Sequence, residues 1–251
     1  MSTYLLSLVS SLADSGSSSD FTTKFDKPLQ FPGDDWEVGL ISAEVPNTFY
    51  NISAALGNNK FYYNDGAVDH TLTIPDGIWE VDSLNTYIQG ADGINGTDIE
   101  LTADVPRLRV MLTLANSYTV DFTQADTFRS ILGFSSAIVS GNGVHYATSK
   151  PDITNGNDHF YITCDLVNST YSRLGGSAKG ILYGFTFTVG AGSAQVVVPS
   201  EHVHLKLSKT YFDTVNVKIV NQDGRVVDLN GERVAVNIKV KKITPIGQAM
   251  F

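Results

Sequence analysis

The sequence has a single cysteine, Cys164, in 251 residues, and it has no long hydrophobic run. One cysteine excludes a disulfide within the chain and is compatible with a reducing compartment. Because the apolar runs are short, we expect no transmembrane helix. Residues 4–13 are apolar but contain three serines and lack a basic leading segment, so we expect a strand and loop rather than a secretory signal. The protein is therefore expected to be made inside the cell and not secreted.

Basic residues are also scarce: 17 Lys and Arg stand against 26 Asp and Glu, which gives a formal net charge of −9. Nonspecific nucleic-acid binding needs clustered basic side chains, so strong binding of this kind is not expected. The one basic cluster is Lys239, Lys241 and Lys242. It is a candidate contact with nucleic acid or with an acidic neighbour in an assembly, although an exposed polar strand face is the simpler interpretation.

What the sequence does contain is strand-like alternation. Apolar and polar residues alternate in residues 107–114, 160–166, 181–189 and 233–241. This period of two, with many β-branched and aromatic residues, predicts half-buried antiparallel strands. The dipeptides Asp65-Gly66, Asp223-Gly224 and Asn230-Gly231 predict tight turns, because glycine adopts positive φ at little cost.

One segment breaks the simple alternation. It carries two apolar sets of opposite parity, Trp36, Val38 and Leu40, then Ile41, Ala43 and Val45. Apolar residues on both faces predict a strand in the middle of a sheet that is covered on both sides.

Only two short helices are expected. Thr123 and Asp126 resemble a capping box for a helix ending near Leu132, with Gly133 as its C-terminal stop. Asp82 is a candidate cap for a helix over residues 83–89. Many strands and few helices predict an all-β sandwich of antiparallel strands. The pattern does not separate a jelly roll from an immunoglobulin-like topology.

The length is compatible with one large domain or with a jelly roll carrying an insertion. We expect a single jelly-roll domain over residues 1–251. Within it, residues 1–20 are a candidate extended N-terminal arm. Residues 135–157, rich in Ser, Gly, Asn and Asp, are expected to form a long loop or insertion.

Residues 21–52, FTTKFDKPLQFPGDDWEVGLISAEVPNTFYNI, resemble the opening of the minor capsid (penton) proteins of Polinton/Maverick elements, adintoviruses and virophages. Four further short motifs occur along the chain in the same order as in that family: residues 4–8, YLLSL; 74–79, IPDGIW; 128–134, FRSILGF; and 160–167, FYITCDLV. The sequence departs from the family pattern around residues 171–183 and 202–206.

This resemblance implies a jelly roll that forms a homopentamer at the vertex of an icosahedral capsid, within the virion. It also implies a double jelly-roll major capsid protein as a neighbour and a host receptor as a further candidate partner. Residues 1–20 and 135–157 are then candidate assembly segments.

No residue pattern predicts catalysis or a cofactor, so we expect no enzyme. Cys164 lies on the apolar side of a strand and is expected to be buried and inert. His202 and His204 share a strand face but lack a third metal ligand in the nearby sequence. A candidate calcium loop consists of Asp92, Asn95, Asp98 and Glu100, although an ordinary acidic turn accounts for it more simply.

The alternative function is a carbohydrate- or receptor-binding module on the same sandwich. The Asp92–Glu100 loop is its candidate site. The aromatic residues Tyr50, Tyr62, Tyr63 and Trp79 could form a sugar-binding shelf, although packing in the core and in interfaces accounts for them more simply. Jelly rolls support both roles, so the fold does not decide between them.

Overall fold

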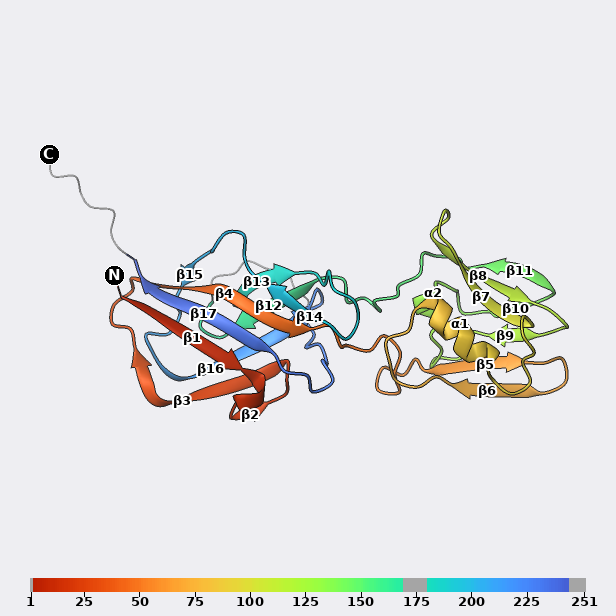
Figure 1. The fold of residues 1–251 in the computed structure, drawn as a ribbon, viewed down its shortest axis with the longest axis horizontal. Coiled ribbons are helices and arrows are strands. Elements are labelled where there is room, and N and C mark those ends of the chain that lie inside the picture. Colours follow the sequence, from red (N-terminus) through yellow and green to blue (C-terminus); the bar gives the residue numbers. More distant parts are fainter. Residues whose placement is uncertain (1, 169–179, 244–251) are drawn as a thin grey trace. The chain divides into compact units, whose positions relative to one another are not determined.

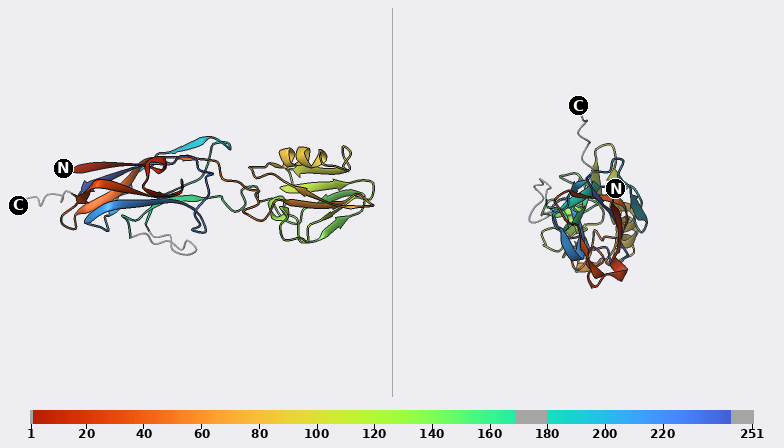
Figure 2. Two further views of the ribbon diagram at one scale, coloured as in Figure 1. Left: turned by 90° about the horizontal axis from the view of Figure 1, so that it is seen from below. Right: turned by 90° about the vertical axis from the view of Figure 1, so that its left-hand side faces the viewer.

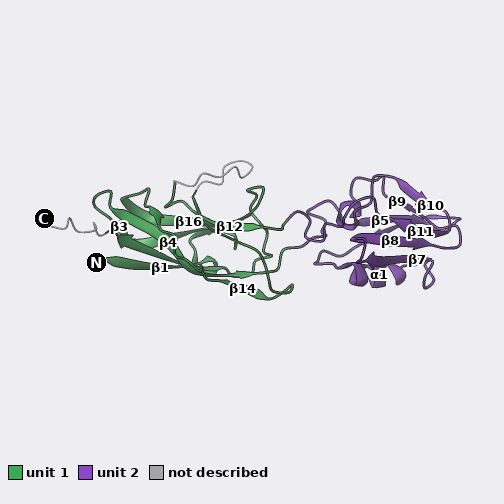
Figure 3. Cartoon of the chain, turned by 90° about the horizontal axis from the view of Figure 1, so that it is seen from above, with its two compact units in different colours: residues 1–49, 157–251 green, residues 50–156 purple. Residues whose placement is uncertain are grey.

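A computed structural model describes residues 2–168 and 180–243. The contacts divide the chain into two compact units (Figure 3). Unit 1 comprises residues 1–49 and 157–251, and unit 2 comprises residues 50–156. Unit 2 is thus inserted in the sequence of unit 1, and each unit is described by itself.

Unit 1 is a sandwich of two antiparallel sheets (Figure 1). The strand order of the first sheet is β1 (Thr3–Val9), β17 (Ala235–Lys242), β4 (Trp36–Pro46) and β14 (Ala194–Val197), with β15 (Leu205–Lys206) also paired to β4. The order of the second is β13 (Ile181–Phe185), β12 (Phe160–Cys164), β16 (Tyr211–Asn221), β3 (Asp20–Gln30) and β2 (Ser15–Gly16). A short 3-10 helix, Ser10–Leu12, follows β1.

Strand β4 shows how the sequence is accommodated in this sandwich. Between Asn237 and Ile238 the register of β17 against β4 shifts, so that Asn237 pairs with Ser42 and Ile238 with Leu40. Ile41 is therefore an extra residue, a β-bulge that reverses the parity of the strand. Ala43 and Val45 consequently reach the same core as Trp36, Val38 and Leu40, so the expectation that the two sets face opposite sides is corrected. Ile41 itself is only partly buried and is not one of these core residues.

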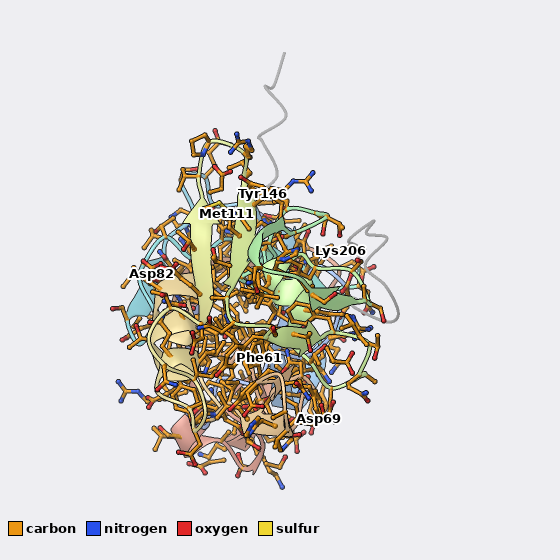
Figure 4. All side chains as sticks on the ribbon, turned by 90° about the vertical axis from the view of Figure 1, so that its right-hand side faces the viewer. Phe61, Asp69, Asp82, Met111, Tyr146 and Lys206 are labelled. Carbon is orange, nitrogen blue, oxygen red and sulfur yellow. The ribbon has the colours of Figure 1, made fainter. Side chains whose placement is uncertain are left out.

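Unit 2 has two smaller sheets and its own core. One sheet contains β10 (Ile138–Ser140), β9 (Thr119–Asp121), β5 (Lys60–Asn64) and β6 (Asp69–Thr73); the other contains β11 (Gly143–Tyr146), β8 (Arg109–Leu114) and β7 (Ile99–Asp104). Helices α1 (Val81–Gln89) and α2 (Arg129–Leu132) also belong to this unit. Phe61, labelled in Figure 4, is fully buried in this core. Its ring stacks on Phe128.

The expected jelly-roll β-sandwich of antiparallel strands with short helices is confirmed at the level of fold class. The single domain expected over residues 1–251 differs from the two units observed, because residues 50–156 bury a separate set of apolar side chains among themselves. Residues 3–9 of the expected arm pair with β17 along their whole length. The expected loop over residues 135–157 contains the short strands β10 and β11.

The helices differ from expectation mainly at their starts. Helix α1 begins at Val81 with Glu80, not Asp82, as its N-cap, and the Glu80 N–H donates to Ser83 Oγ at 3.1 Å. Helix α2 begins at Arg129, not near Thr123. Before it, the Thr123 N–H donates to Asp121 Oδ1 at 2.7 Å and Thr127 forms a bridge to Lys60, so this stretch is not helical. Gly133 does end α2, with a φ of 82°.

Candidate interaction surfaces

The candidate calcium loop of residues 92–100 is closed by hydrogen bonds of its own residues and of Asn116. Asp98 is buried; its Oδ2 accepts the Asn95 N–H at 3.1 Å and its Oδ1 accepts from Asn116 Nδ2 at 2.7 Å. Within the described ranges, no three or more His, Cys, Asp or Glu side chains form a group that could hold a metal. The geometry therefore explains Asp98 as a carboxylate that closes the loop, and Asp92 and Glu100 do not join it in such a group.

The two histidines and the cysteine do not form a reactive site either. His202 and His204 precede β15 rather than lying on a strand, and His202 Nδ1 is 3.2 Å from the Leu40 carbonyl oxygen. Burial and the nearby Lys241 ammonium lower the pKa of His204. Burial also raises the pKa of Cys164 to about 12, so its thiol stays protonated near neutral pH.

The three C-terminal lysines lie on β17, where the alternation predicted a polar strand face. Lys241 Nζ is 3.5 Å from Glu37 Oε2, and Lys242 Nζ is 3.1 Å from Asp35 Oδ2. Lys239 lies between Leu5 of β1 and Gly39 of β4 in the sheet register. Two of these lysines thus have acidic partners in their own chain, and a role of the three in assembly stays a prediction.

A polar network that the sequence did not reveal joins the strands of the second sheet of unit 1. Asp165 Oδ1 accepts the Asn216 N–H at 3.0 Å, and its other oxygen pairs with Lys209. Asp20 accepts from Asn216 Nδ2 at 3.0 Å and pairs with Lys218 at 2.8 Å. Burial of Asp20 opposes ionisation, but these two partners outweigh it and lower the pKa of the carboxyl group. The network fixes the strands to one another.

The predicted aromatic shelf is divided among different surroundings. Tyr62 donates to Asp126 at 3.0 Å, and the Tyr63 ring stacks on His70 at 4.9 Å. Trp79 instead meets Tyr87 of α1 edge to face, with ring centroids 5.3 Å apart. These two rings line a shallow depression of about 430 Å³ together with the hydroxyl-bearing Ser83 and Thr86.

Comparison with solved structures identifies the architecture. The chain superimposes on the crystal structure of a mavirus penton protein with a TM-score of 0.50 and 10% sequence identity, covering 96% of this chain and 100% of that one. The chain has the penton protein fold. A chain of the Sputnik virophage, determined by cryo-electron microscopy, is similar with a TM-score of 0.44 and 13% identity, covering 96% of this chain and 98% of that one.

The penton resemblance expected from the sequence is therefore confirmed for the fold. No protein-family model matches the chain, and no curated protein matches it. In the part of the chain that the structure describes, no helix has the length and apolar character to cross a membrane.

Proposed function

We propose that the protein is a structural capsid protein, a penton-type vertex subunit that assembles as a pentamer. The observation that carries this proposal is the match to the mavirus penton protein over the full length of that chain, with both units included in the 96% coverage. The ordered sequence phrases between residues 4 and 167 support it independently of the fold. The expected partners are further copies of this chain and a major capsid protein, and the expected location is the virion.

The edges of the first sheet of unit 1 supply two different surfaces for a ring. Strand β1 is one end of that sheet and exposes Leu5 by 64%, whereas β14 lies at the other side of β4 and exposes Val196 by 62%. A ring needs a head-to-tail interface made of two unlike patches on each subunit. Unpaired strand edges with apolar residues are suited to such contacts, because association covers their free backbone groups.

Light scattering together with negative-stain imaging of the purified protein tests this proposal. We expect five-fold rings, and Leu5→Lys should shift the mass toward the monomer, because a charge would be placed in the interface. Val226→Lys, an exposed site of unit 1 outside these two strands, is the matched control and should leave the rings intact. Monomers at all concentrations, even with the major capsid protein added, would contradict the proposal.

One observation favours carbohydrate binding as a second candidate function. The depression beside Trp79 and Tyr87 combines two partly exposed rings with the Ser83 and Thr86 hydroxyl groups, which suits the apolar face and the hydroxyls of a sugar. Glycan-array binding that is lost in Trp79→Ala, in a protein that stays folded, would support this function.

A further inference from the structure

The three-stranded sheet of unit 2 has one covered edge and one open edge. Helix α1 lies beside β7, and there Asn85 Oδ1 accepts the Leu101 N–H at 2.7 Å. At the opposite end of the sheet, β11 pairs with β8 alone among the described strands. The Ala147 N–H donates to the Val110 carbonyl at 2.9 Å. Because partners alternate along an antiparallel strand, Val144 and Tyr146 direct their backbone N–H and C=O groups away from β8.

The side chains at this open edge have the composition of a binding surface. Val144 is 50% exposed and Tyr146 is 48% exposed, and Tyr146 pairs with Met111 on the same outer face (Figure 4). The adjacent turn between β7 and β8 exposes Val105 by 71% and Leu108 by 60%. Aromatic, aliphatic and arginine side chains gathered at one place are typical of the energetic centre of a protein interface.

Two arginines form a small pocket beside this edge. The pocket has a volume of about 230 Å³ and is lined by Arg107, Arg109 and Tyr146. The Arg107 guanidinium carbon lies 5.6 Å from the centre of the Tyr146 ring, and Arg107 Nη1 is 2.7 Å from Asp104 Oδ2. Arg109 Nη1 donates to the Ala147 carbonyl at 2.5 Å. Asp104 thus pairs with Arg107, whereas Arg109 contacts a neutral carbonyl group. The two guanidinium groups together keep a net positive charge and further N–H donors for a ligand.

The charge of the rest of the unit makes this pocket distinctive. Residues 50–156 contain twelve Asp and Glu but only five Lys and Arg. One of these five, Arg129, donates to the carbonyl oxygens of Phe122 and Gln124. An acidic ligand is therefore repelled by most of the unit and attracted at Arg107 and Arg109, which would fix its position.

We propose that β11 binds an extended segment of a partner protein by strand addition, with an acidic side chain of that segment held by Arg107 and Arg109. The main-chain groups of Val144 and Tyr146 supply the hydrogen bonds of the added strand, and the arginine pair sets its register. Apolar side chains of the segment pack on Val144 and Met111. The site lies within unit 2 and does not depend on ring formation. The test of peptide binding can therefore fail while the penton proposal holds, and the reverse.

The pocket is tested with the full chain and nine-residue fluorescent peptides of alternating Thr and Val, each with one Glu at a different position. Fluorescence polarisation should detect binding of at least one peptide. Replacing its Glu by Gln should weaken binding about tenfold, as expected for the loss of a charge-assisted contact. Arg107→Gln should cause a similar loss, whereas Arg233→Gln, the same change at an exposed site of unit 1, should cause none. Absence of binding by every peptide, or equal binding of the Glu and Gln forms, would overturn the proposal.

Strand addition is tested separately at Val144. Val144→Pro removes an N–H that points away from β8, which an edge strand tolerates, so the pairing of β11 with β8 should survive. We expect Val144→Pro to abolish peptide binding and Val144→Ala to retain it within about threefold. Amide exchange in β8 verifies that both variants are folded. Equal binding by the two variants would overturn strand addition, as would binding of free glutarate with the affinity of the peptide.

Discussion

The separate core of unit 2 leads to a prediction about Phe61→Ala. The Phe61 ring is fully buried and stacks on Phe128 with centroids 5.6 Å apart; it also meets Tyr63 at 5.8 Å and Phe122 at 6.4 Å. Truncation of a buried Phe to Ala costs about 3–5 kcal/mol, since it removes apolar contacts and leaves a cavity. Whole domains are stable by only about 5–15 kcal/mol, so the loss is a large fraction of the stability of unit 2.

The expected result is a change confined to one unit. A loss of this size lowers the melting temperature of a domain of about 100 residues by at least about 12 °C. Calorimetry should therefore show an early transition for unit 2, while the transition of unit 1 stays in place. Hydrogen exchange should assign it, with faster exchange in β5, β8 and β9 and unchanged exchange in β4, β16 and β17 (Figure 2).

The matched control is Phe31→Ala in the core of unit 1. Phe31 is buried to a similar degree and stacks on Phe212 at 5.5 Å. It should destabilise unit 1 and leave unit 2 unaffected. If either substitution moved a single transition of the whole protein by the same amount, the argument that the two cores are energetically separate would be refuted.

Three further predictions follow from individual residues. Because burial raises the pKa of Cys164 to about 12, a thiol reagent at pH 8 should label it only after denaturation; fast labelling of the folded protein would contradict this. Gly133→Ala should lower the free energy of unfolding by about 1–3 kcal/mol, because the φ of Gly133 is 82° and a Cβ there would lie 2.3 Å from the Ser149 carbonyl oxygen. An unchanged melting curve would contradict this prediction. Hydrogen bonds from His70 and from the Val68 and Ala67 amides lower the pKa of Asp65 from 3.8 to about 2. This stabilisation is therefore present above pH 3.8 and lost as the pH falls toward 2. The protection factors of the turn amides, taken relative to the intrinsic exchange rate at each pH, should fall over that range in the native protein and not in Asp65→Asn.

The sequence predicted individual strands better than their grouping. Alternation in residues 160–166 and 233–241 located β12 and β17, because each has one buried and one polar face. The two parities in β4 were visible, but the bulge at Ile41 depends on pairing with β17, which lies almost 200 residues further along the chain. The division into two cores likewise depends on which apolar residues meet, and alternation does not contain that information.

The candidate surfaces likewise depend on contacts between residues that lie far apart in the sequence. Alternation over residues 107–114 placed Arg107 and Arg109 on one strand face. In the structure β8 begins at Arg109 and Arg107 lies in the preceding turn. Their third partner, Tyr146, joins them only through the antiparallel pairing of β11 with β8. The acidic loop of Asp92, Asn95, Asp98 and Glu100 was conspicuous in sequence, yet Asn116, which binds Asp98, was absent from that pattern.

The inserted position of unit 2 allows assembly and partner binding to be separated experimentally. The first sheet of unit 1 joins β1 to β17, so strands from both ends of the chain complete it without a strand of residues 50–156. A chain in which a flexible Gly-Ser linker replaces residues 50–156 should therefore keep the sandwich, since its core is built from residues of unit 1 alone. If the sheet edges of unit 1 carry assembly, this chain should still form five-fold rings by negative stain and should no longer bind the acidic peptides. Circular dichroism of the strands shows whether this shortened chain is folded. If it is folded but forms no rings, the ring contacts belong to unit 2 instead.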